Sequence, residues 1–128
     1  MNYLLDVNAL VAALWSTHEH HARIHRWLAA RASGDAVLSC CVTELGFIRV
    51  INAAYSVPID EAKSALGEFR RRAKLRYLEV APSPLDGLPR WTRSHKQVMD
   101  AYLVGLAEHH GATLATLDRG IPGATLIG

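Results

Sequence analysis

The sequence predicts an α/β domain in which a mainly parallel sheet is covered by helices on both faces. Short apolar runs of strand length alternate with longer segments whose apolar residues recur every three or four positions. Strands that alternate with helices imply right-handed crossovers between parallel strands. The chain has no internal repeat, linker or low-complexity tract. We therefore expect one domain over residues 1–128, long enough to bury a sizeable core.

The first predicted strand covers residues 3–5, and a helix follows over 8–15. The next helix, over 18–32, carries Ile24 and Trp27 at helical spacing and ends at Ser33–Gly34.

A second strand at 36–38 precedes a helix that runs to residue 54, which Ser39 is placed to cap. Pro58 and Asp60 begin a further helix, rich in Ala and Arg, that continues to residue 74.

The last third of the chain repeats the alternation. A strand at 76–80 is closed by the loop APSPLDGLP, and a strong helix over 98–110 is stopped by Gly111. Strands at 113–117 and 125–127 complete the prediction.

Composition favours a soluble, reduced setting. No apolar stretch approaches the roughly 20 residues of a membrane helix, and the start carries no basic region followed by a cleavage site. The two cysteines, Cys40 and Cys41, are adjacent and cannot join distant segments. We expect a cytoplasmic protein that makes no contact with a membrane.

Four carboxylates fall on one predicted edge of the sheet. Asp6 follows the first strand and Asp118 follows the strand TLATL, and sites in such sheets form outside the carboxyl ends of the strands. Glu44 and Asp100 lie on the apolar stripes of helices that start on this side. A hard divalent cation takes oxygen ligands and would neutralise the repulsion among these acids.

Three of the four acids also have a plainer interpretation. Asp6 could cap its helix, Asp100 could favour its helix dipole, and Asp118, in LDRG, could be a turn residue. The net charge of +2 is uninformative until the four acids are counted separately from the rest of the chain. If the four acids are set aside, 14 Lys and Arg face eight acids, which suits a polyanion lying across the outside.

Two other groups of residues attract attention. His18, His21 and His25 stand at three- and four-residue spacing. His21 and His25 could share a zinc ion, but no third ligand is evident, so a solvated helix face is favoured over a zinc site. The basic run at 69–76 is either a solvated face or a contact for RNA phosphates.

A second basic cluster is favoured as the substrate groove. It precedes Asp100 in the chain and includes Arg93, Ser94 and Lys96.

Three segments, in this order, resemble the PIN-domain family, and most closely the VapC toxins of bacterial toxin–antitoxin pairs. The segments are LLDVNALVAAL, TELGFIRV and DAYLVGLAEHHGATLATLD. The resemblance covers nearly the whole chain. It implies a three-layer α/β/α sandwich and a Mg²⁺- or Mn²⁺-dependent endoribonuclease. It further implies a cognate antitoxin as partner and a toxin homodimer.

The resemblance also implies roles for individual residues. Asp6, Glu44, Asp100 and Asp118 match the family's acidic quartet, and Asn8 and Thr116 match the polar residues that support it.

Within that quartet we expect Asp6 and Asp100 to ligate the ion directly, because a strand end and a helix start are rigid platforms. Asp118 would bind through water or through a second ion, and Glu44 would orient the attacking water. Many relatives carry a further acid after Asp118, where this chain has Arg119 and Gly120, so a second ion lacks that ligand.

Two rivals remain open. A phosphatase with an aspartyl nucleophile would carry DxDxT at the first strand, whereas this chain has DVNAL, which lacks the second Asp and the Thr. A PIN-type module that binds nucleic acid without catalysis is disfavoured. Such a binder gains nothing from burying negative charge near a polyanion.

Overall fold

The computed structural model describes residues 1–128 and contains a five-stranded sheet in which every pairing is parallel. The strand order is β3-β2-β1-β4-β5. The strands are β1 (Asn2–Leu5), β2 (Ala36–Cys40), β3 (Arg76–Leu78), β4 (Thr113–Thr116) and β5 (Thr125–Leu126).

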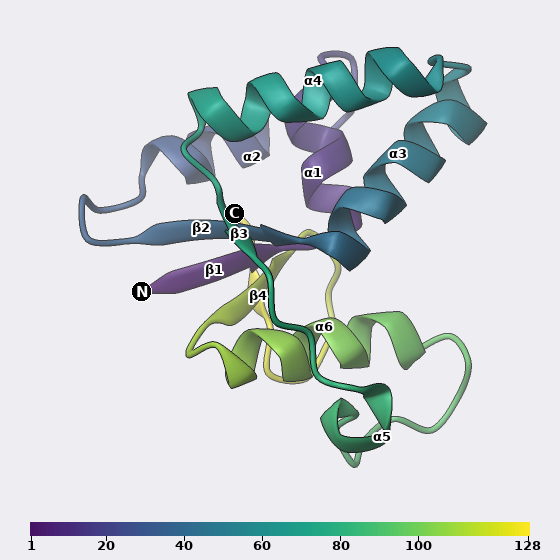
Figure 1. Cartoon of the computed structure of the whole chain (residues 1–128). Helices are drawn as coiled ribbons and strands as arrows, with labels where there is room; N and C mark the ends of the chain where they lie inside the picture. Colours follow the sequence, from purple (N-terminus) through teal and green to yellow (C-terminus); the bar gives the residue numbers. More distant parts are fainter.

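The helices form a layer on each face of this sheet (Figure 1). One layer contains α1 (Val7–Leu14), α2 (His21–Ala29), α3 (Cys41–Tyr55) and α4 (Ile59–Arg72). The other contains α5 (Pro84–Gly87) and α6 (Val98–His109). The predicted α/β/α sandwich is thereby confirmed. None of these helices combines the length and the hydropathy that crossing a bilayer requires.

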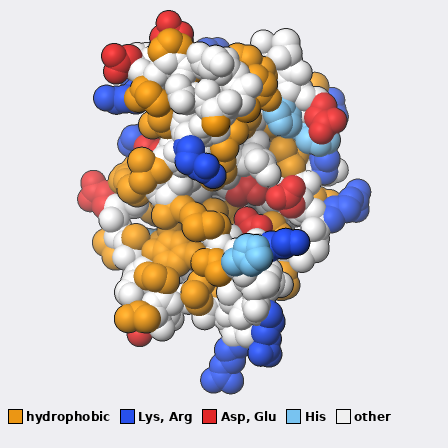
Figure 2. Space-filling view, turned by 90° about the vertical axis from the view of Figure 1, so that its right-hand side faces the viewer, with side chains coloured by type: hydrophobic (Ala, Val, Ile, Leu, Met, Phe, Trp, Pro, Cys, Tyr) orange, Lys and Arg blue, Asp and Glu red, His pale blue; other side chains and the backbone are white.

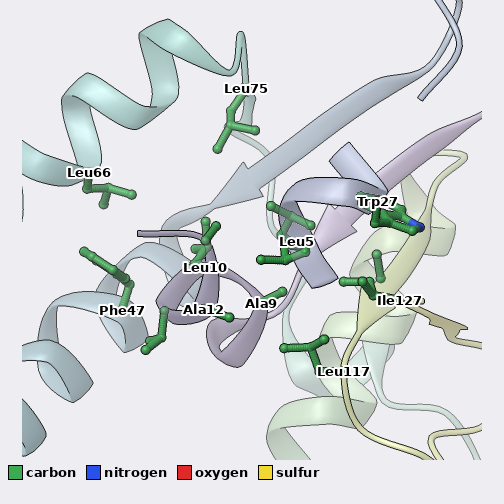
Figure 3. Close-up of a cluster of buried hydrophobic side chains, with 14 of the residues drawn as sticks. Leu5, Ala9, Leu10, Ala12, Trp27, Phe47, Leu66, Leu75, Leu117 and Ile127 are labelled. Carbon is green, nitrogen blue, oxygen red and sulfur yellow. The ribbon is translucent and has the colours of Figure 1, made fainter. Parts of the chain in front are cut away.

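The central strand β1 is buried on both faces, which explains its continuous apolar sequence. Tyr3 and Leu5 point into the larger core, beneath α1 to α4, while Leu4 points into the smaller core under α6. Figure 3 shows Leu5 beside Trp27 in the larger core.

The sheet reverses its strand order beside β1. The chain leaves β1 towards β2 and β3 through the first helical layer, then returns through α6 to β4 on the other side of β1. Ligands of open α/β sheets bind outside the carboxyl ends of the strands at such a reversal. Asp6 directly follows β1, and Asp118 lies two residues after β4, so both acids stand at this point.

Two local predictions differ from the structure. Ser39 belongs to β2 and does not cap the following helix. Cys40 is the capping residue of α3, and its backbone N–H bonds the Thr43 hydroxyl at 3.1 Å. The loop APSPLDGLP contains the short helix α5, which Ser83 caps by accepting from the Leu85 N–H at 3.2 Å.

The histidines of α2 do not simply form a solvated face. His21 Nδ1 lies 2.8 Å from the Ala12 carbonyl oxygen, and His25 Nε2 lies 2.7 Å from that of Ala13. These carbonyls lie in the last turn of α1, where the final C=O groups of a helix have no N–H partner within the helix. The two imidazole rings therefore provide hydrogen-bond partners for free carbonyl oxygens at the carboxyl end of α1.

Helices α1 and α3 touch at Gly46. A β-carbon at this position would overlap the Val7 side chain, which is branched and stiff. Gly46 therefore sets how closely α3 approaches the first turn of α1, next to Asp6.

We predict that Gly46→Ala lowers the free energy of unfolding by about 1–3 kcal/mol, because the added methyl must displace packed groups. Gly67→Ala is the matched control. Its β-carbon would meet only Arg71 Nη1, at 3.8 Å, and removing a helical glycine should stabilise α4 by about 0.5–1 kcal/mol. Urea denaturation of both variants measures the difference. Equal stabilities would contradict the proposed contact.

Candidate active site

The carboxylate of Asp6 combines a capping role with a place in the site. The residue is 3% exposed. Its Oδ1 accepts a hydrogen bond from the Ala9 backbone N–H at 2.8 Å, as the N-cap of α1. Its Oδ2 accepts from the Thr116 hydroxyl. Both oxygens are thus fixed in direction at the end of β1.

Burial raises the pKa of Asp6 from 3.8 to about 6. The hydrogen bonds from Thr116 and Ala9 act in the opposite direction, because they favour the charged form. The negative charges of Asp118 and Asp100 raise the pKa further. The charges of Asp118 and Asp100 therefore act on Asp6 electrostatically at this end of the sheet.

Asp100 and Asp118 complete this group. Asp100 stands in the first turn of α6, and burial followed by the charge of Asp118 raises its pKa. Asp118 is exposed, and its Oδ2 lies 3.5 Å from the Asn8 amide nitrogen, which donates to it.

The hydroxyl of Thr116 links two of the acids. It donates to the Asp6 carboxylate and accepts from the Asp118 backbone N–H at 3.0 Å. Thr116 is 1% exposed, so this link is shielded from water. The position of the Asp118 loop is tied in this way to the orientation of Asp6.

The surface at this end of the sheet is hollowed. Figure 2 shows acidic side chains gathered in a depression near the centre of the face, with His, Lys and Arg side chains at its rim and hydrophobic side chains beside it. Asp6 and Asp100 line a pocket of about 470 Å³ there, between α1, α3 and α6.

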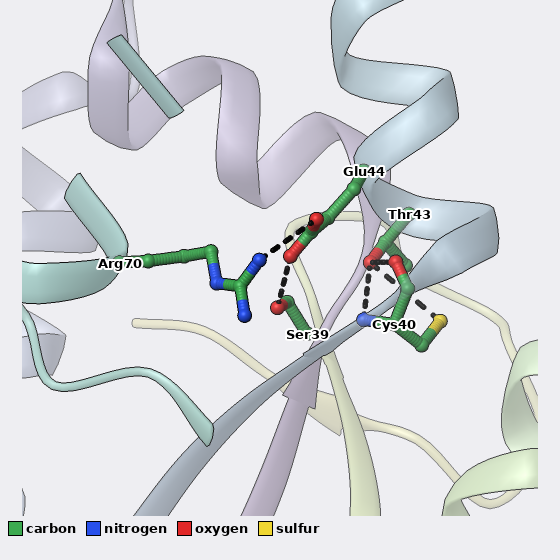
Figure 4. A network of polar contacts seen from close by, with 5 residues as sticks. All are labelled: Ser39, Cys40, Thr43, Glu44 and Arg70. Carbon is green, nitrogen blue, oxygen red and sulfur yellow. Dashed lines mark hydrogen bonds and ion pairs between the residues drawn. The ribbon is translucent and has the colours of Figure 1, made fainter. Parts of the chain in front are cut away.

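Glu44 stands apart from this group. Its Oε2 accepts from the Ser39 hydroxyl at 2.6 Å, and its Oε1 lies 3.4 Å from Arg70 Nη1 (Figure 4). The Arg70 guanidinium also lies over the Tyr77 ring, 4.9 Å from its centre. Glu44 does not line the pocket of Asp6 and Asp100, and its charge is not among the causes that raise the pKa of either residue.

The sequence alone did not identify Ser39 or Arg70 as contacts of Glu44. The one available signal was a polar residue between Leu38 and Cys40 in an apolar strand. Alternation directs Ser39 to the face opposite theirs, where α3 and α4 lie.

The donor set is compatible with a hard divalent cation. As they stand, no three His, Cys, Asp or Glu side chains are gathered tightly enough to hold an ion together. Asp6, Asp100 and Asp118 nevertheless offer only oxygen atoms, the donors that Mg²⁺ and Mn²⁺ prefer. Their mutual repulsion is also what a cation would relieve.

The basic cluster before α6 is fully accessible. Arg93, Ser94 and Lys96 are exposed. The Gln97 side-chain oxygen accepts from the backbone N–H groups of Arg93 and Ser94, at 2.7 and 3.3 Å. These bonds fold the loop against the start of α6, close in the chain to Asp100.

A larger groove of about 890 Å³ lies at the other end of the sheet. Its lining includes His21 of α2, Phe69 of α4 and Arg31 from the segment after α2, and none of the four acids. The acidic pocket is therefore the better candidate for chemistry.

Comparison with known proteins gives a consistent family. The PIN domain model matches residues 3–124. Ribonuclease VapC38 of Mycobacterium tuberculosis is 40% identical over 123 residues, covering 92% of this chain and 86% of the relative. Ribonuclease VapC44 of the same species is 38% identical over 138 residues, covering 98% of this chain and 95% of the relative.

Solved structures share the fold. VapBC2 from Rickettsia felis, bound to a DNA fragment from its promoter, matches with a TM-score of 0.67 at 16% identity, over 98% of this chain and 97% of that chain. VapC20 of Mycobacterium tuberculosis, a toxin that cleaves the sarcin–ricin loop, also matches with a TM-score of 0.67, at 13% identity. That match covers 92% of this chain and 89% of that chain.

We predict that Asp6→Asn stabilises the metal-free protein at pH 7.5. An acid whose folded pKa of about 6 exceeds its unfolded value of 3.8 stabilises the fold below pH 3.8 and loses that contribution as pH rises through 6. The amide carries no charge to bury, so the gain is at most about 3 kcal/mol.

Thermal unfolding of both proteins between pH 4 and pH 8, with EDTA present, measures this effect. The stability of the wild type should fall relative to that of Asp6→Asn as pH rises. A constant difference between the two proteins would contradict the raised pKa.

Proposed function

The chain belongs to the PIN-domain family, and from that membership we propose that it is a metal-dependent endoribonuclease that acts as the toxin of a toxin–antitoxin pair. The observation that carries the proposal is the Asp6 carboxylate at the strand-order reversal, whose pKa is raised by burial first and further by the charges of Asp118 and Asp100. The VapC relatives, named as ribonucleases, support the same reaction class.

Asp6 and Asp100 are the proposed direct ligands of Mg²⁺ or Mn²⁺, and Asp118 joins them directly or through water. When bound, the ion supplies an acidified water for attack and positive charge for the phosphate oxygens. The Thr116 hydroxyl donates to the Asp6 carboxylate and the Asn8 amide donates to that of Asp118, so these bonds would hold both carboxylates in direction.

Glu44 is the proposed positioning residue for the attacking water. It stands in the first turn of α3, at the same end of the sheet as the three aspartates. Its carboxylate is bound by Ser39 and Arg70, and these contacts would have to open for Glu44 to take this role.

The proposed partners are those that the relatives suggest. Solved neighbours that are VapBC assemblies support an antitoxin partner for this chain. RNA is the proposed substrate, a homodimer the proposed assembly and the cytoplasm the proposed location. The exposed Arg93, Ser94 and Lys96 are the proposed contacts for RNA phosphates.

We predict that purified protein cleaves RNA with Mg²⁺ or Mn²⁺ and not with EDTA. Asp6→Asn and Asp100→Asn should each lower the rate by about 100-fold or more, because each removes a charge that holds the ion. Total RNA and structured RNA are the substrates, and gel electrophoresis of the products measures the cleavage. Binding of Mn²⁺, followed by its electron paramagnetic resonance signal, should weaken in both variants.

Asp86→Asn is the control for this experiment, because Asp86 is an exposed carboxylate on α5. It should keep the wild-type rate and metal affinity. Wild-type rate and affinity in Asp6→Asn and Asp100→Asn would contradict the proposed site. A folded wild type that binds RNA, but neither binds metal nor cleaves, would favour the module without catalysis.

We predict that Lys96→Ala weakens RNA binding and lowers its dependence on salt. Loss of one phosphate contact should reduce the slope of log K against log salt by about 0.7. Fluorescence anisotropy at several KCl concentrations measures the slope. Lys63→Ala, which removes an exposed lysine from α4, is the matched control and should leave the slope unchanged. An unchanged slope in Lys96→Ala would exclude this loop from the substrate groove.

A further inference from the structure

We propose that the pocket beside Asp6 and Asp100 receives the base of an unpaired nucleotide adjacent to the scissile phosphate. The inference rests on the proposed ribonuclease function and adds a subsite for part of the substrate. It assigns the recognition of that base to side chains of α3 and α6, outside the acidic residues themselves.

The walls of the pocket are mainly apolar. Apart from the two acids, Asn8, Gly46 and Arg49, its lining consists of Val7, Val42, Leu45, Val50, Met99 and Leu103. Its volume of about 470 Å³ is in the range of pockets that bind small organic ligands, a class that includes a single nucleotide. The apolar lining suits the faces of a base and does not suit the charged backbone.

Two of these wall residues are uncovered. Leu45 is 62% exposed and Met99 is 57% exposed, and they come from different helices, α3 and α6. Large apolar side chains that meet around a hollow gain free energy when a flat apolar surface covers them. A base inserted between α3 and α6 would provide that surface.

The position of the pocket relative to the acids selects RNA as its occupant. Asp6 and Asp100 form part of its lining, so a phosphate engaged at these acids lies at the pocket's edge. The base attached to a neighbouring sugar is then within reach of the apolar walls. The pocket and the proposed reaction centre are therefore continuous.

Arg49 adds a charge of the right sign. It is exposed, lines the pocket and has no carboxylate within ion-pair distance. Arginine binds both phosphate oxygens and the faces of bases, so this side chain can contact the nucleotide from the rim.

The bottom of the pocket is formed where α1 contacts α3. Gly46 and Val7 both line it, and a β-carbon at Gly46 would overlap Val7. The floor of the pocket is thus packed backbone and a stiff side chain, which gives it a fixed shape.

A base can enter this pocket only if it is not stacked in a helix. Recognition of RNA by sequence is directed mostly to loops, bulges and ends, where bases can turn outwards. The pocket therefore predicts cleavage beside an unpaired nucleotide, with the surrounding structure read through phosphate contacts.

The test uses short unstructured RNAs that carry 2-aminopurine at one position at a time, and matched RNAs that lack the base at one position. Ca²⁺ replaces Mg²⁺ so that binding can be measured without cleavage, which gel electrophoresis verifies. The protein variants are the double variant Leu45→Ala with Met99→Ala, and Arg49→Ala. The control is Leu85→Ala, because Leu85 is 94% exposed on α5 and does not line the pocket.

One position of the RNA should change its fluorescence on binding to the wild type. Removing the base at that position, or truncating Leu45 and Met99, should each weaken binding by about five- to tenfold. Because both changes remove the same contact, the double variant should lose little further affinity for the RNA without the base. Arg49→Ala should weaken binding of both RNAs, and Leu85→Ala should match the wild type.

Several results would overturn the proposal. They are a fluorescence change at no position, equal affinity for RNA with and without each base, or wild-type binding by the double variant. The last result would leave the pocket to an apolar side chain of a protein partner.

This test is independent of the cleavage experiment. A wild type that places a base in the pocket but cleaves no RNA would refute the ribonuclease proposal and leave a base-binding pocket with no scissile phosphate beside it. Metal-dependent cleavage with no effect of the pocket variants would do the reverse.

Discussion

The structure depends on how one carboxylate is kept at the end of the central strand. Asp6 is buried where β1 meets α1, and its two oxygens accept hydrogen bonds from α1 and from β4. These bonds offset part of the cost of removing the charge from water. The same residue therefore starts a helix, joins two neighbouring strands and supplies the acid around which Asp100 and Asp118 are arranged.

The sequence was sufficient to predict the features that the path of the backbone determines. Strand length, helical spacing and turn residues located all of the longer elements to within a few residues. The carboxyl ends of parallel strands share one edge, so Asp6 and Asp118 could be placed together without knowledge of any side-chain contact. Asp100 could be added because an apolar stripe fixes which face of α6 meets the sheet.

The sequence could not predict the features that depend on competition between neighbours. Glu44 was expected beside the aspartates, but the direction of its carboxylate is decided by tertiary contacts with Ser39 and Arg70. The contacts of the two histidines of α2 could not be predicted, because the carbonyls that they bond belong to another helix. Neither the periodicity of a segment nor its composition contains this information.

The contact between Asp6 and Thr116 has a consequence for synthesis on the ribosome. The two residues are 110 positions apart in the chain, and β1 lacks its β4 neighbour until the last part of the domain emerges. A nascent chain therefore contains Asp6 and its capping N–H from Ala9 long before it contains Thr116, which orients the other carboxylate oxygen. All four acids are present only once residue 118 has been made, so a chain that stops before it lacks part of the candidate site.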